Sequence, residues 1–139
     1  MDKLSLLQSV PIFSDLSASD LNKIADRMVL RSFTKGQMIL LEDDLGQTFF
    51  VIGGGSVKIT RLSDDGREVI LAMLGESDFF GEMSLLDGAG RSANVVALEA
   101  SEVLTLARND FLEILQEYPK ISISLLAILN PSELRELIK

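Results

Sequence analysis

Cysteine and histidine are both absent from this chain of 139 residues. Without cysteine, the chain cannot form disulfides, thiolate metal sites, iron–sulfur clusters or a cysteine nucleophile. Without histidine, it lacks the most common metal ligand, the most common general base and the usual axial ligand of haem. We therefore predict a protein that is not an enzyme and that has neither a metal site nor a cofactor.

Positive charge is scarce as well. Lys and Arg total 13 against 21 Asp and Glu, which gives a formal net charge of −8. A surface that binds nucleic acid needs clustered cations to neutralise phosphates, and the sequence holds no Lys/Arg cluster. We therefore expect no nucleic-acid partner and no DNA-binding domain.

Long apolar runs are also missing. The most apolar stretch, residues 121–129, is half of the roughly 18 residues that a membrane-spanning helix requires. The first residues, MDKLSLLQSVPIF, lack the long apolar run and the small-residue cleavage site of a signal peptide. Apolar residues still make up 47% of the chain, enough to form a core. We expect no membrane contact and a cytoplasmic location.

A chain of this length corresponds to about one domain of roughly 150 residues. The spacing of its apolar residues changes twice along the sequence. Residues 1–28 show helical spacing of apolar side chains, with Pro11 ending the first segment and Ser17 placed to cap the second. Residues 108–139 are helical again, with Asn109 or Asp110 expected as the N-cap. Asn130-Pro131 is expected to end one helix and begin another.

Between these helical parts, residues 29–107 consist of short apolar runs separated by turn residues. Such spacing predicts an antiparallel β-sandwich or barrel, here a β-roll of jelly-roll type, and argues against alternating βαβ units. Asp65-Gly66 between two of the runs is a strong hairpin signal. The runs are Met38–Leu41, Thr48–Ile52, Val57–Thr60, Val69–Leu74, Asn94–Leu98 and Val103–Ala107.

The stretch that carries chemistry is residues 78–93, DFFGEMSLLDGAGRSA. Gly81 would let a ligand approach the backbone, and Arg91 could grip two phosphate oxygens with its planar guanidinium. Ser92 would add a hydroxyl donor, whereas Glu82 would repel a phosphate and fits better as the acceptor of a sugar hydroxyl. The alternative is that Glu82 and Arg91 form a structural ion pair across a hairpin.

Gly81-Glu82-Met83-Ser84-Leu85-Leu86 and then Arg91-Ser92-Ala93 closely resemble the phosphate-binding cassette of the cyclic nucleotide-binding domain family. That family includes bacterial cAMP-receptor transcription regulators, regulatory subunits of cAMP-dependent kinase, and nucleotide-gated channels. A weaker likeness extends over residues 7–16, 55–59 and 64–80. The resemblance implies that residues 1–139 form a single cyclic nucleotide-binding domain.

The resemblance also implies roles for particular residues. Glu82 would bind the ribose 2′-hydroxyl, while Arg91 and Ser92 would bind the cyclic phosphate. We expect cAMP rather than cGMP as the ligand. The backbone of Gly81, Met83 and Ser84 would assist. The family's last helix usually covers the base, but Asn130-Pro131 interrupts it here, so Leu74, Asn130 and Arg135 are only candidates for base contacts.

The function that follows is a regulatory module whose C-terminal helices pass ligand binding to a protein partner or to a second copy of the chain. Leu134, Leu137 and Ile138 are the residues expected to face that partner. One alternative is a degenerate β-roll that serves only as a protein-interaction module without nucleotide. A cupin-type barrel enzyme is the third, and it is disfavoured because such enzymes typically hold a metal with histidines.

Overall fold

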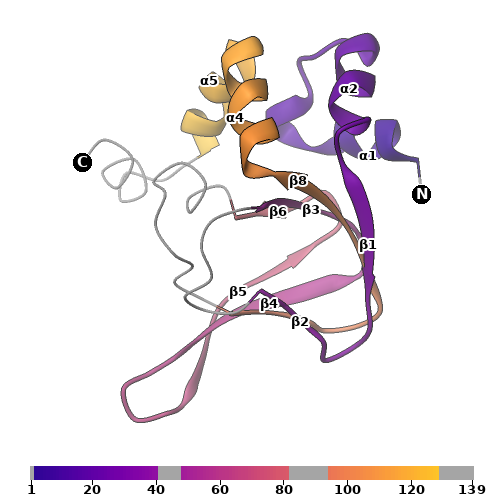
Figure 1. Cartoon of the computed structure of the whole chain (residues 1–139). Helices are drawn as coiled ribbons and strands as arrows, with labels where there is room; N and C mark the ends of the chain where they lie inside the picture. The colour runs from indigo at the N-terminus through magenta and orange to yellow at the C-terminus, as the bar shows by residue number, and fades with distance from the viewer. Residues whose placement is uncertain (1, 41–47, 82–93, 129–139) are drawn as a thin grey trace.

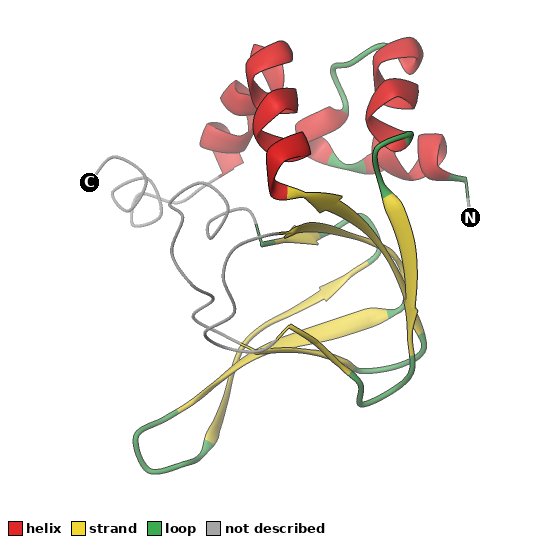
Figure 2. Cartoon of the chain, in the orientation of Figure 1, coloured by secondary structure: helices red, strands yellow, loops and turns green. Residues whose placement is uncertain are grey.

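The computed structural model describes residues 2–40, 48–81 and 94–128 of the chain. It places helices at one end of a roll of antiparallel strands, as Figures 1 and 2 show, and it confirms the predicted fold class. The elements in chain order are α1 (Lys3–Ser9), the 3-10 helix η1 (Pro11–Phe13), α2 (Ala18–Ala25), β1 (Val29–Phe33), β2 (Met38–Leu40), β3 (Thr48–Gly54), β4 (Ser56–Leu62), β5 (Glu68–Gly75), β6 (Phe79–Phe80), β7 (Asn94–Ala97), β8 (Ser101–Ala107), α4 (Arg108–Glu117) and α5 (Pro119–Ile128).

The strands form two four-stranded sheets, one with the order β1-β8-β3-β6 and the other with the order β2-β7-β4-β5. Every pairing between these strands is antiparallel. Strands that follow each other in the chain often lie in different sheets, which is the winding expected of a jelly roll. The exception is the β4–β5 hairpin, which extends beyond the rest of the roll in Figure 2.

The predicted turn at Asp65-Gly66 is confirmed at the tip of that hairpin. Gly66 has a φ of 82°, a left-handed conformation that glycine adopts without a steric penalty. The Ser63 amide donates to the Arg67 carbonyl at 2.8 Å, and the Arg67 amide donates to the Asp65 carboxylate at 3.3 Å. Backbone and side chain together therefore close the turn.

Two apolar clusters lie on opposite sides of β3, because successive side chains of a strand point to opposite faces. Phe49 faces the helices, where it stacks on Phe111 of α4 with ring centroids 4.6 Å apart. Phe50 faces the interior of the roll, where it stacks on Phe80 at 4.6 Å. The first cluster holds the helices on the roll, and the second joins the two sheets.

The helix caps agree with the sequence at the N-terminal end but not at α4. Ser17 accepts a hydrogen bond from the Asp20 amide at 3.1 Å, as predicted for the start of α2. The expected cap of α4 at Asn109 or Asp110 is wrong, since the helix begins at Arg108 with no side-chain cap. The reason is that β8 runs directly into α4, and burial of Phe111 fixes where the helix begins.

Two strands were not predicted from the sequence. In β1, four of the five residues are exposed, so the strand has no alternating apolar pattern to reveal it. β6 has only two residues, too few for any periodicity. No helix in the described part of the chain is both long enough and apolar enough to cross a membrane.

Candidate functional site

The chain enters the predicted cassette from β6, and β6 is fixed by its two phenylalanines. Phe80 is buried in the roll against Phe50, and its backbone pairs with that residue in the register of β3. Phe79 points to the other side, with its ring centroid 5.6 Å from that of Phe49. Stacked aromatic pairs of this kind contribute beyond the area they bury. The entry to the cassette therefore has a defined position on the sheet.

Gly81 follows β6 with a φ of 95°. This left-handed region is costly for any residue with a Cβ and open to glycine. This glycine therefore has a backbone role as well as the proposed role of admitting a ligand. The cassette therefore begins, directly after β6, at a backbone conformation that favours glycine.

The turn before β6 is held to the roll by several hydrogen bonds. The Gly75 amide donates to the Asp78 carboxylate at 2.8 Å, and the Ser77 amide donates to the Ile52 carbonyl at 2.9 Å. The Ile52 amide in turn donates to the Asp78 carbonyl at 2.9 Å. Ser77 itself has a φ of 74°, which is rare for a residue other than glycine and is maintained here by these contacts.

The chain leaves the cassette at β7, which belongs to the other sheet. Val95 and Ala97 of β7 are buried, and the strand pairs with both β4 and β2. Residues 82–93 thus connect an edge strand of one sheet to an internal strand of the other.

The described wall beside these anchors is apolar. It consists of a set of buried apolar side chains and of partly buried side chains packed against them. Leu74, which was predicted to contact the base, is one of the partly buried residues. The buried set is Phe50, Ile52, Val57, Phe80, Val95 and Val103, and the neighbours are Phe33, Ile39, Ile59 and Leu74.

Of the residues predicted to bind ligand, the structure brings Gly81 to the end of β6 and Leu74 to the wall of the roll. The other predicted residues lie outside the described parts of the chain, and so do those expected to face a partner. They are Glu82, Met83, Ser84, Arg91, Ser92, Asn130 and Arg135 for the ligand, and Leu134, Leu137 and Ile138 for the partner.

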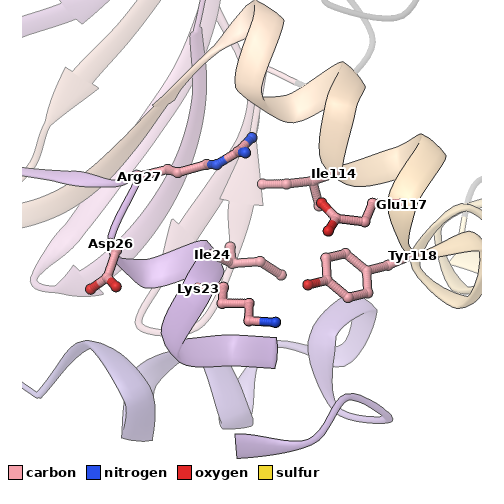
Figure 3. Close-up of a pocket in the computed structure, with 7 residues that line it drawn as sticks. All are labelled: Lys23, Ile24, Asp26, Arg27, Ile114, Glu117 and Tyr118. Atoms are coloured by element: carbon pink, nitrogen blue, oxygen red, sulfur yellow. The ribbon is translucent and has the colours of Figure 1, made fainter. Parts of the chain in front are cut away.

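A separate cavity of about 310 Å³ lies between α2 and α4, and Figure 3 shows the side chains around it. Arg27 lies at its rim and donates to Glu113 at 2.8 Å and to Asp110 at 3.5 Å. Because Arg27 is held by carboxylates of α4, its contacts join the end of α2 to that helix. Sequence reasoning missed this junction, since its partners are more than 80 residues apart.

Tyr118 projects into the same region from the end of α4. Desolvation raises the pKa of its hydroxyl above the ordinary value of 10.0, and the negative charges of Asp20 and Glu117 raise it further. The phenol therefore stays protonated at neutral pH and can donate to a neighbouring carboxylate. It acts as a structural group between the two helices.

The comparisons with known proteins agree with this geometry. A family model described as the cyclic nucleotide-binding domain matches residues 30–118. The cyclic AMP receptor protein of Thermus thermophilus is 35% identical over 123 residues, which cover 88% of this chain and 57% of that protein. The cGMP-dependent protein kinase egl-4 of Caenorhabditis briggsae is 37% identical over 114 residues, covering 81% of this chain and 15% of the kinase.

Among solved structures, the Thermus thermophilus catabolite activator protein matches with a TM-score of 0.81 and 36% identity. The match covers 91% of this chain and 59% of that one. This chain therefore spans little more than half the length of its bacterial relative and a small part of the kinase.

Proposed function

We propose that this chain, which belongs to the cyclic nucleotide-binding domain family, is a regulatory module that binds cAMP in preference to cGMP. The observation that supports the proposal is where the described chain stops and resumes around the motif. Its glycine stands in a left-handed conformation at the end of β6, and the chain returns to the opposite sheet at β7 directly after Arg91-Ser92-Ala93.

In the proposed site, charge and shape come from different parts of the chain. Arg91 and Ser92 bind the cyclic phosphate, and Glu82 accepts the ribose 2′-hydroxyl. The backbone of Gly81, Met83 and Ser84 supplies further contacts. The base rests beside the apolar wall that includes Leu74, with Asn130 and Arg135 as further candidates for base contacts. Binding is reversible and leaves the ligand unchanged, since the motif offers no general base and no metal to activate water.

We further propose that ligand binding is passed to the C-terminal helices through β3. Phe50 contacts Phe80, the residue before the cassette, and its neighbour Phe49 contacts Phe111 of α4. A shift of β6 would therefore reach α4 through two stacked pairs on opposite faces of one strand. Coupling of this kind needs two packings of the helices with a free-energy difference of about 1–3 kcal/mol.

The chain is 35% identical to a cyclic AMP receptor protein, which supports the preference for cAMP. Its sequence identity to a cGMP-dependent kinase over this domain is of the same size, at 37%. The partner that responds is proposed to be a protein or a second copy of the chain, contacted through Leu134, Leu137 and Ile138. We propose that the N-terminal helices, the roll and the C-terminal helices together form a single module over residues 1–139.

Isothermal titration calorimetry with cAMP, cGMP and 5′-AMP tests the proposal. We expect saturable binding of cAMP, weaker binding of cGMP and none of 5′-AMP, because only the cyclic phosphate has the geometry the cassette fits. Chromatography after incubation should recover cAMP intact. Tighter binding of cGMP would overturn the preference, and no heat with either cyclic nucleotide would favour an interaction module without nucleotide.

A further inference from the structure

The outer strand of the second sheet carries an unusual amount of exposed apolar surface. β5 lies at the edge of the order β2-β7-β4-β5, and within the described residues β4 is the strand that pairs with it. Val69, Ile70, Leu71 and Met73 are all exposed, and Met73 is exposed to 63%. These side chains lie on one strand of the hairpin that extends from the roll in Figure 1.

Natural edge strands are usually protected from pairing with other chains. They are kept short, or they carry lysine, proline or inward charges. β5 has eight residues, and from Val69 to Gly75 it has no charged residue and no proline. Its one irregularity is a shift of the β4 register at Leu71, between the pairs Ile59↔Ala72 and Thr60↔Ile70. Such a bulge adds local twist but leaves the edge apolar.

The charge on this strand is compatible with a second copy of the chain as the occupant of the edge. The single charge of the strand, on Glu68, is paired with Lys58 of β4 at 2.8 Å. An antiparallel partner with the same sequence would place Glu68 opposite Gly75 at each end, with only apolar residues between. The two Glu68 residues would be roughly 24 Å apart at 3.4 Å per residue, well beyond the Debye length of about 8 Å. A second copy of this chain is therefore a charge-compatible partner.

We propose that β5 is a self-association edge, on which two copies of this chain pair antiparallel about a twofold axis. Pairing would join two four-stranded sheets into one continuous sheet and would satisfy the backbone groups of each β5 that no described strand pairs with. Twofold contacts are self-complementary, so one apolar strand supplies both halves of the interface. With all eight residues overlapped, Met73 of one copy lies opposite Ile70 of the other. The proposal does not depend on nucleotide binding.

Sedimentation velocity of the full chain without nucleotide, over a range of concentrations, tests the proposal. We expect a monomer–dimer equilibrium, and we expect Met73→Lys to weaken the dimer at least about tenfold because a lysine must then lose water against apolar side chains. Val29→Lys is the matched control, since Val29 is exposed to 60% on β1, an edge strand of the other sheet. It should leave the dimer unchanged. Circular dichroism checks that each variant is folded.

A charge exchange tests the register. The Met73→Lys variant and the Ile70→Glu variant should each be monomeric when measured alone. An equimolar mixture of the two should form a heterodimer in which the new lysine lies opposite the new glutamate. A wild-type chain that stays monomeric at all concentrations would overturn the proposal. So would a dimer that resists Met73→Lys, one that Val29→Lys dissociates equally, or a mixture that fails to associate.

Discussion

Glu82 is the residue whose proposed role is least expected from charge alone. A carboxylate near a phosphate is repulsive, so it contributes to affinity only if it accepts a hydrogen bond from the ribose 2′-hydroxyl. We expect 2′-deoxy-cAMP to bind the wild type more weakly than cAMP, and to bind Glu82→Gln about as well as cAMP does. Competition titrations measure this, with Glu102→Gln on β8 as the control variant. Equal binding of both ligands to the wild type would contradict the role.

Gly81 offers a comparison between two glycines of one chain. Gly81 has a φ of 95°, whereas Gly54 has no left-handed backbone and a Cβ added to it would meet nothing within 4 Å. We expect Gly81→Ala to lower the free energy of unfolding by about 1 kcal/mol or more, through strain in the left-handed region. Gly54→Ala should have little effect or stabilise slightly. Urea unfolding of both variants checks this, and an equal loss for both would refute the strain argument.

Tyr118 predicts how stability depends on alkaline pH. The pKa of its hydroxyl is raised in the folded protein, so the folded state binds the proton more tightly than the unfolded state. Its contribution is therefore fully present below pH 10, the ordinary pKa, and is lost as the pH rises through the raised folded-state pKa. We expect Tyr118→Phe to flatten this alkaline loss in a series of thermal unfolding curves. An unchanged pH profile in the variant would contradict the assignment.

At the scale of elements, α4 and α5 are the segments expected to respond to ligand. α4 rests on the roll through Phe111, and α5 buries Ile121 and Leu125 while Ile123 stays exposed to 67%. We expect cAMP to change amide hydrogen exchange across residues 108–128 as well as around the cassette, with no change in Arg91→Ala at the same cAMP concentration. Altered protection confined to residues 78–93 would mean that binding is not transmitted through these helices.

Elements with a clear periodic or capping signal were predictable. Ser17 and the turn at Asp65-Gly66 act locally, and the structure has both where the sequence placed them. The start of α4 was missed because tertiary burial of Phe111, not a local cap, decides it. β1 was missed because an exposed edge strand needs no apolar alternation.

At the scale of the whole molecule, the order of helices, roll and helices followed from the change in texture along the chain. The candidate site followed from one short motif. Gly81 shows why a motif can be informative where periodicity is not, because its φ angle favours glycine. The contact of Arg27 with α4 could not be foreseen, because topology alone brings these distant residues together. The edge at β5 was likewise hidden, since its apolar run indicates burial equally well.

The central claim is that this roll binds a cyclic phosphate through Arg91. Calorimetric titration of cAMP into Arg91→Ala and into Arg67→Ala tests it most directly, since Arg67 is an exposed arginine in the β4–β5 turn paired only with Asp65 among the described residues. Loss of a buried charged partner costs about 2–5 kcal/mol, so Arg91→Ala should bind cAMP roughly 30- to 3,000-fold more weakly. Arg67→Ala should bind like the wild type. Binding by Arg91→Ala within about threefold of the wild type, a difference of less than 1 kcal/mol, would contradict the account.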